Sequence, residues 1–335
     1  MTFAVNIAQS GSNNQTMRNR IINGAMTIDQ RNNGAAVTAS GTYPVDRFRT
    51  FKDTASGTLT GQRSTIAPAG FTNSLSYTIT SAFTPSSSEG NSFTQLIEGF
   101  NVADFAWGTA SAQPVTLSFW VRASVTGTYG GSVRNSAANR SYPFAYTISA
   151  ANTFEYKTIT VPGDTTGTWE TGNGVGIFLF FSLGTGSVLT GTAGAWANGN
   201  FINVTGATNI TSTAGATYYI TGVQLEEGTA ASPFENRLIG TELQLCQRYY
   251  ESGRFYQNSG SSSNNPFYEF LILFKVDKRA TPSMSTLVGN YTNTGGGNGI
   301  APEYLSITSK DSLVRPVNQT TWAAANFTWA ANGEL

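Results

Sequence analysis

The side chains that could carry out chemistry in this 335-residue chain are few, and their types exclude most catalytic mechanisms. There is no histidine, so the Ser-His-Asp and Cys-His arrangements that activate a nucleophile cannot be built. The single cysteine, Cys246, cannot form an internal disulfide, and no common zinc site can be assembled without histidine partners. Glycoside hydrolysis needs only two carboxylates, but none of the 19 acidic residues forms a pair in an aromatic setting. We therefore predict that the protein is not an enzyme.

Aromatic side chains beside polar groups offer a second kind of chemistry, because sugars bind flat aromatic faces with hydrogen-bonding groups nearby. Trp120 and Arg122 lie on the polar side of an alternating strand, and Tyr129 and Trp169 lie at strand-to-loop junctions. Each has an alternative interpretation as a packed structural residue, and Trp120 would then be covered by another strand or subunit. With three aromatic residues of the C-terminal part, the candidate glycan contacts are Trp120, Arg122, Tyr129, Trp169, Tyr291, Tyr304 and Trp322.

Oxygen donors gather at Asp164, Glu170 and Asn173, and hard cations favour carboxylate and amide oxygens. Their spacing matches no defined cation-binding loop. We therefore expect neither a metal nor a cofactor.

Charge and hydropathy exclude two classes of partner. Charged residues make up 11% of the chain, and the 19 basic side chains balance the 19 acidic ones, so no electrostatic field favours nucleic acid or an anionic membrane. The longest apolar run, Val175–Leu183, is about half the length of a membrane-spanning helix, and we interpret it as a strand buried on both faces. The first eleven residues show no secretory signal. A soluble protein made in the cytoplasm, without membrane insertion, is expected.

Strands must position these side chains, because alternation of apolar and polar residues dominates the chain. In Val115–Arg122 the residues Val115, Leu117, Phe119 and Val121 share one face. Glycine-containing clusters such as Gly130-Gly131 are interpreted as turns between strands. The pattern predicts an all-β fold, a jelly-roll-like antiparallel β-sandwich, followed by a short linking helix and a second, smaller β domain. Similar strands are expected at 75–79, 142–148, 154–161, 175–183 and 217–225.

One helix interrupts the strands between Thr241 and Tyr250. Thr241 and Gln244 have the spacing of a capping box, and Leu243, Cys246 and Tyr250 recur as one apolar stripe. Cys246 is interpreted as a buried apolar residue rather than a nucleophile. The stripe could pack on its own domain or on a neighbouring subunit, and we favour the second.

The expected organisation has four parts. Residues 1–20 form an N-terminal attachment arm, 21–235 the jelly-roll domain, 236–252 the linking helix and 253–335 a C-terminal β tip. A frayed terminus is an equally good interpretation of the arm. Asp46 and Arg47 are interpreted structurally, as a pair that pins the leading segment to the sandwich.

Several stretches within 19–250 resemble a module of bacteriophage tail-fibre and related virion proteins. They are NRIINGAM (19–26) with DQR (29–31), YPVDRF (43–48), QLIEGFNVADFAWGT (95–109), VTLSFWVRA (115–123), FEYKTITVPGDTTGTW (154–169) and ITGVQLEEGTAASPFENRLIGTELQLCQRYY (220–250).

The resemblance implies a jelly roll similar to carbohydrate-binding modules, set in a homotrimeric fibre or spike whose far end meets the host surface. On this interpretation the chain is a structural virion component that adheres to a host-surface glycan or protein. Its other partners would be copies of itself and virion proteins bound through the N-terminal arm. Two alternatives stay open: a capsid-bound head fibre or decoration protein, and a glycan-degrading tailspike enzyme.

Overall fold

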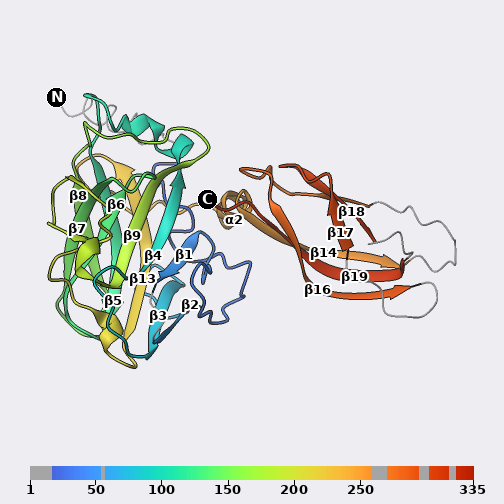
Figure 1. The fold of residues 1–335 in the computed structure, drawn as a ribbon, viewed down its shortest axis with the longest axis horizontal. Helices are drawn as coiled ribbons and strands as arrows, with labels where there is room; N and C mark the ends of the chain where they lie inside the picture. The colour runs from blue at the N-terminus through green and yellow to red at the C-terminus, as the bar shows by residue number, and fades with distance from the viewer. Residues whose placement is uncertain (1–16, 54–56, 259–269, 294–301, 317–321) are drawn as a thin grey trace.

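The computed structural model describes residues 17–53, 57–258, 270–293, 302–316 and 322–335. Within these ranges the chain forms two β lobes of unequal size, with helix α2 (Ile239–Gln247) at the junction between them (Figure 1). The C-terminal end of the chain returns to this junction (Figure 1).

The large lobe is an antiparallel sandwich of two sheets. One sheet has the order β1 (Phe48–Lys52), β4 (Gly90–Glu98), β9 (Val175–Thr185), β6 (Gly127–Arg134), β7 (Arg140–Ile148) and β11 (Ala197–Asn198). The other has the order β2 (Thr58–Ser64), β3 (Ser74–Ser81), β13 (Thr217–Glu227), β5 (Val115–Ala123) and β8 (Glu155–Val161). Connecting segments contain the short parallel pair β10 (Thr190–Gly191) and β12 (Asn203–Val204), and the 3₁₀ turns η1 (Gly99–Asn101), η2 (Ala103–Phe105), η3 (Ser187–Leu189) and η4 (Ile210–Ser212).

Alternating side chains build the core between the two sheets, as the sequence predicted. Val115, Leu117, Phe119 and Val121 of β5 are all fully buried. From the opposite sheet, Phe181 packs edge-on against Phe119, with ring centroids 5.1 Å apart. The predicted all-β, jelly-roll-like sandwich is therefore confirmed.

Strand β9 departs from its predicted environment. Ile177, Leu179 and Phe181 face the core, whereas Phe178 and Phe180 lie on the outer face of the six-stranded sheet. Phe180 is buried there, but Phe178 is only half-buried. The interpretation of this run as buried on both faces is thus correct for only part of the strand.

The Gly130-Gly131 pair is not a turn but lies inside strand β6. A Cβ atom on Gly131 would come within 2.1 Å of the backbone oxygen of Phe180, and one on Gly130 within 2.8 Å of Val204. Glycine is needed here because neighbouring segments approach the β6 backbone closely. The predicted turn is therefore wrong. Residues 127–134 form one continuous strand, in which Tyr129 and Val133 point to the core and Arg134 points outward.

The small lobe consists of two three-stranded antiparallel sheets, as expected for the C-terminal part. Their orders are β14 (Tyr250–Asn258), β19 (Trp322–Asn332), β16 (Ser283–Asn293) and β15 (Phe270–Leu273), β18 (Asp311–Pro316), β17 (Pro302–Leu305). Ile272, Val314, Phe327 and Trp329 form the centre of its core.

Helix α2 packs on its own chain, which corrects the preference for a neighbouring subunit. Cys246 and Tyr250 are buried, and Cys246 contacts Ile22 and Ile28 of the leading segment, with Leu243 packed at the margin. The predicted capping box is absent, because the helix begins at Ile239 and no side chain caps it. No helix in the described ranges is long and apolar enough to span a bilayer.

The leading segment belongs to the sandwich from its first described residues. Asn19 is buried, and its Oδ1 accepts hydrogen bonds from the backbone N–H groups of Ile21 and Leu225. Arg20 is buried and its backbone N–H donates to the oxygen of Leu225. The predicted arm therefore does not extend to residue 20, and its residues 1–16 lie outside the described ranges.

The predicted structural role of Asp46 and Arg47 is confirmed, although the two side chains bind different partners. Asp46 accepts hydrogen bonds from Gln30 and Arg31, which fixes the leading segment. Arg47 donates to the backbone oxygen of Leu96, 2.5 Å away, and forms an ion pair with Glu334. The second contact joins the sandwich to the end of the small lobe.

Candidate functional site

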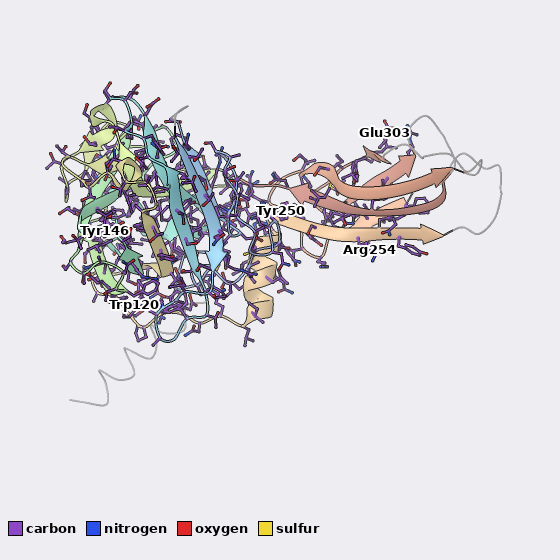
Figure 2. All side chains as sticks on the ribbon, turned by 90° about the horizontal axis from the view of Figure 1, so that it is seen from below. Trp120, Tyr146, Tyr250, Arg254 and Glu303 are labelled. Carbon is purple, nitrogen blue, oxygen red and sulfur yellow. The ribbon has the colours of Figure 1, made fainter. Side chains whose placement is uncertain are left out.

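The structure brings together two of the predicted glycan contacts, Trp120 and Arg122, on the outer face of the five-stranded sheet. Trp120 lies 5.3 Å from the ring of Tyr156, which is 45% exposed. The guanidinium of Arg122 lies over the rings of Tyr219 and Phe154, at 4.9 and 6.0 Å. Figure 2 shows Trp120 at the edge of the large lobe, away from the junction marked by Tyr250. This aromatic face is one candidate surface.

Tyr129 is not available to a ligand. Its side chain is fully buried, and its hydroxyl donates to the backbone oxygen of Val125 at 2.7 Å. Burial raises the pKa of this phenol above its usual value. The prediction is wrong because Tyr129 falls on the core side of β6, whose alternation the two glycines concealed.

Trp169 packs into a cluster of three tryptophans at one end of the sandwich. Its ring lies 4.8 Å from that of Trp107 and 5.4 Å from that of Trp196. Its indole N–H donates to Asp164, which also forms an ion pair with Arg140 at 2.6 Å. These contacts give Trp169 a packing role apart from Trp120 and Arg122.

The three candidates of the small lobe do not join either group. Tyr304 packs against the lobe's core, and its hydroxyl lies 2.9 Å from the hydroxyl of Thr286. The side chains of Tyr291 in β16 and Trp322 in β19 lie outside the described residues.

The oxygen donors considered for a cation have protein partners. Asp164 is bound by Arg140, Glu170 accepts from the backbone N–H of Gly172, and the Asn173 amide donates to the oxygen of Arg279. The part of the chain that the structure describes contains no cluster of three histidine, cysteine, aspartate or glutamate side chains.

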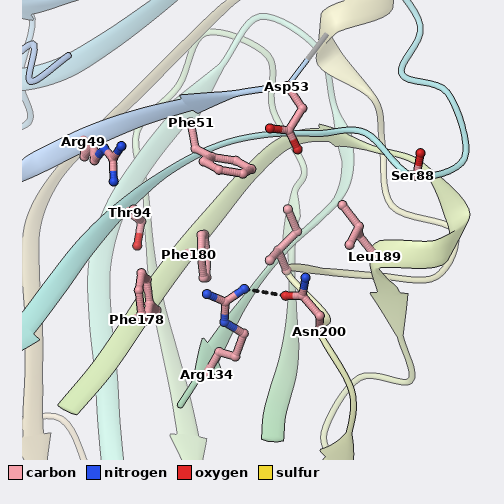
Figure 3. A pocket seen from close by; sticks show the side chains of 11 residues that line it. Arg49, Phe51, Asp53, Ser88, Thr94, Arg134, Phe178, Phe180, Leu189 and Asn200 are labelled. Atoms are coloured by element: carbon pink, nitrogen blue, oxygen red, sulfur yellow. Dashed lines mark hydrogen bonds between the residues drawn. The ribbon is translucent and has the colours of Figure 1, made fainter. Parts of the chain in front are cut away.

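A pocket of about 190 Å³, which we call the Arg134 pocket, lies on the outer face of the six-stranded sheet (Figure 3). The face that carries Trp120, the Trp120 face, belongs to the other sheet of the sandwich. None of the predicted site residues lines the Arg134 pocket. Its walls combine phenyl rings with charged and amide groups from β1, β4, β6, β9 and their connecting loops: Arg49, Phe51, Asp53, Ser88, Thr94, Arg134, Phe178, Phe180, Leu189, Asn200 and Ile202.

Strand register explains why these distant residues meet. Arg49 pairs with Thr94 across β1 and β4, Thr94 pairs with Phe180 across β4 and β9, and Phe178 pairs with Arg134 across β9 and β6. Paired residues of neighbouring strands point to the same face of a sheet. The five side chains therefore form two adjacent rows on the outer face.

Arg134 is held in a fixed position on this face. Its guanidinium lies over the rings of Phe178 and Phe180, at 4.6 and 4.8 Å, and donates to the amide oxygen of Asn200 (Figure 3). Its Nε is buried without a hydrogen-bond partner. Burial lowers the pKa of Arg134 to about 10, so the group remains a cation at neutral pH.

The remaining polar groups lie toward the rim. The side chain of Arg49 forms no ion pair or hydrogen bond within the described residues, and Phe51 presents a half-buried ring beside it. Asp53 is exposed and accepts a weak hydrogen bond, 3.4 Å long, from the backbone N–H of Gly90. It is the only carboxylate among the residues that line the pocket. The arrangement suits binding of a polar ring and lacks the second carboxylate of a glycosidase.

The amino-acid sequence alone does not reveal this pocket, for two reasons. Phe178 and Phe180 were predicted to lie in a strand buried on both faces. Gly130 and Gly131 were interpreted as a turn, so the strand that places Arg134 on the outer face was not predicted. One signal was available: the alternation of Ile177, Leu179 and Phe181 with the two outer phenylalanines puts two large aromatic rings on a single outer face.

Comparisons with known proteins find similarity among solved structures. No family model matches the chain, and no curated protein matches it. The enzymatically active domain of bacteriophage CBA120 tailspike protein 4 is similar over 63% of this chain, at 15% identity and a TM-score of 0.32, and this chain spans 22% of the tailspike chain.

Two further structures come from bacterial carbohydrate-active proteins. The CBM22-1 and GH10 modules of Clostridium thermocellum xylanase 10B, complexed with xylohexaose, are similar over 63% of this chain and 31% of theirs, at 12% identity and a TM-score of 0.30. The N-terminal cellulose-binding domain of Cellulomonas fimi glucanase C is similar over 61% of this chain and 95% of its own, at 14% identity and a TM-score of 0.28. Such low scores transfer neither a ligand nor an activity, so both must be inferred from the chain's own residues.

Proposed function

We propose that this chain is a non-enzymatic, glycan-binding subunit of a bacteriophage fibre or spike, and that the Arg134 pocket holds one sugar of a host-surface glycan. The observation that carries the proposal is the composition of the pocket. Phe51 offers a ring for stacking, and Arg49, Thr94 and Asn200 surround it with hydrogen-bonding groups.

Binding without cleavage is the activity that the pocket supports best. Hydrolysis of a glycosidic bond by the usual route requires two carboxyl groups across the scissile bond. Asp53 is the sole acid among the lining residues, and it lies exposed at the rim. Incubation with host polysaccharide should therefore leave its chain length unchanged.

The virion assignment rests on the resemblance of residues 19–250 to phage fibre modules. A homotrimer would place three pockets on one particle component, and many such components would convert weak single contacts into firm adhesion. Sedimentation of the full chain tests the oligomer, and a stable monomer would count against it. Antibody labelling of intact particles separates a tail fibre from a head fibre or decoration protein.

Retention on immobilised host envelope polysaccharide tests the pocket. Phe51→Ala removes the stacking ring and should weaken binding about tenfold, which corresponds to about 1.4 kcal/mol. Trp120→Ala, on the opposite sheet, serves as the matched control and should leave binding within about twofold of wild type. Equal losses in both variants, or a loss only for Trp120→Ala, would place the glycan elsewhere.

A further inference from the structure

The charges of the Arg134 pocket point to a particular class of sugar, an inference that rests on the proposed function. Two guanidinium groups face this pocket, and neither Arg49 nor Arg134 has a carboxylate partner among the described residues. Two other arginines of the large lobe do have such a partner: Arg47 is paired with Glu334 and Arg140 with Asp164. The pocket is thus left with uncompensated positive charge in a chain whose net charge is zero.

Asp53 does not neutralise these cations. It is exposed at the rim, forms no ion pair within the described residues, and accepts only the weak bond from Gly90. Counting the lining residues gives two cations, Arg49 and Arg134, against this one anion, an excess of one positive charge. A ligand that enters the pocket meets a field favourable to an anion.

The geometry of Arg134 suits a carboxylate in particular. The guanidinium lies over the rings of Phe178 and Phe180, its Nε is buried, and Asn200 accepts from one of its two terminal nitrogens, so the donors left for a ligand are on those terminal nitrogens. A planar, pre-oriented guanidinium binds carboxylate through two parallel N–H···O bonds, and little side-chain freedom is lost on binding. A neutral hydroxyl cannot use this fork in the same way.

Arg49 reaches the same region from the other side. Its strand β1 and the Arg134 strand β6 are separated by β4 and β9, which at normal strand spacing puts their backbones about 14 Å apart. Figure 3 shows Arg49 and Arg134 on opposite sides of Thr94, Phe178 and Phe180. Two long side chains that approach from opposite sides of the pocket can bind one anionic group between them.

We propose that the pocket is selective for acidic glycans, and that the carboxylate of a uronic or sialic acid residue binds Arg134, with Arg49 completing the site. The aromatic ring of Phe51 contacts the sugar itself, so the sugar ring and its acid group are recognised by different residues.

A panel of oligosaccharides that contain galacturonate, glucuronate or sialic acid, each beside its carboxyl-reduced counterpart, tests the proposal by calorimetry on the full chain. The best acidic member should bind at least about tenfold more tightly than its reduced form, and this margin should shrink as salt is added. Equal affinity for the two forms would overturn the acidic preference while leaving glycan binding intact. Binding to no member at all would overturn the proposed function as well.

Variants locate the effect. Arg134→Gln and Arg49→Gln should each reduce the ratio of the affinity for the acidic form to that for the reduced form about tenfold. Arg122→Gln is the matched control, because Arg122 also lies over two aromatic rings but on the opposite sheet. A loss of acid preference in Arg122→Gln equal to that in Arg134→Gln would contradict the assignment, as would tighter binding of phosphorylated sugars than of every carboxylate. Thermal unfolding confirms that each variant is folded, and Arg49, which is half-buried on β1, provides the substitution with the smaller structural effect.

Discussion

Arginine side chains illustrate how residues of one type take different roles in this chain. Arg47 is 2% exposed, lies 3.5 Å above the ring of Tyr249 and forms an ion pair with Glu334. Arg49, two residues further on, lies in β1 and points toward the pocket. Arg47 precedes that strand and has a positive φ of 72°, so the alternation of β1 does not extend to it and the two side chains take different directions.

This separation predicts different stabilities for two neighbouring variants. Arg47→Met should lower the free energy of unfolding by about 2–4 kcal/mol, because Glu334 would keep only one of its two cations, Arg31, and the buried oxygen of Leu96 would lose its donor. Arg49→Met, its matched control, should cost less than about 1 kcal/mol. Urea denaturation measures both, and similar losses would contradict the structural role assigned to Arg47.

Tyr129 gives a second test at this scale. Tyr129→Phe removes the hydroxyl that donates to Val125 and should lower the free energy of unfolding by about 1 kcal/mol. Glycan affinity should stay unchanged, because the ring remains buried in the core. Weakened binding at unchanged stability would restore Tyr129 as a contact residue.

Residue-level prediction from the sequence succeeded where strand phase was clear. The alternation in β5 correctly predicted that Trp120 and Arg122 lie on an outer face. Their neighbours on that face, Tyr156 and Tyr219, were not predicted. In β6, Gly130 and Gly131 have no side chains that show which residues face the core. Tyr129 was therefore predicted to be accessible at a loop, whereas it lies in the core. The requirement for glycine there comes from the approach of Phe180 and Val204, which no local pattern reveals.

Helix α2 shows, at the scale of elements, the same difference between what a local pattern predicts and what it does not. Its existence and its apolar stripe were predicted from residue spacing, but its partner was not. Ile22 and Ile28, more than 200 residues earlier in the chain, cover Cys246. Helix periodicity identifies the apolar face and leaves open which segment packs on it.

The packing of α2 predicts an unreactive thiol. Cys246 is 1% exposed, and burial raises the pKa of its thiol well above the usual value, so little thiolate forms at pH 8. Native protein should not react with a disulfide reagent over hours, whereas protein in guanidinium chloride should release one equivalent at once. Rapid labelling of native protein would mean that α2 leaves its contact with the leading segment.

At the scale of the whole molecule, buried ion pairs hold the two lobes in a defined relation. Glu334 accepts from both Arg31 and Arg47 of the large lobe. Arg279 of the small lobe donates to the backbone oxygen of Asn173 at 2.8 Å. The sequence predicted the two lobes and their order, but partners about 300 residues apart could not be paired from local patterns.

This junction predicts how the lobes unfold. In Glu334→Gln, Arg31 and Arg47 lose the carboxylate that joins the lobes, and calorimetry should show the single transition splitting into two. Glu303→Gln is the control, because Glu303 forms a half-exposed ion pair with Arg315 within the small lobe, away from the junction (Figure 2). Separate transitions already present in the wild-type protein would contradict the coupling.

A fixed arrangement of the two lobes favours adhesion, because a pocket whose direction is fixed loses less conformational entropy when it binds a surface glycan.

We propose above that the glycan binds in the Arg134 pocket and not on the Trp120 face.

Hydrogen–deuterium exchange of the full chain, with and without host envelope polysaccharide, tests this claim most directly. We predict slower exchange in β1 around Arg49 and Phe51 and in the connecting segment from Leu189 to Asn200. Protection confined to β5 and β8 around Trp120, or no protection anywhere, would contradict it.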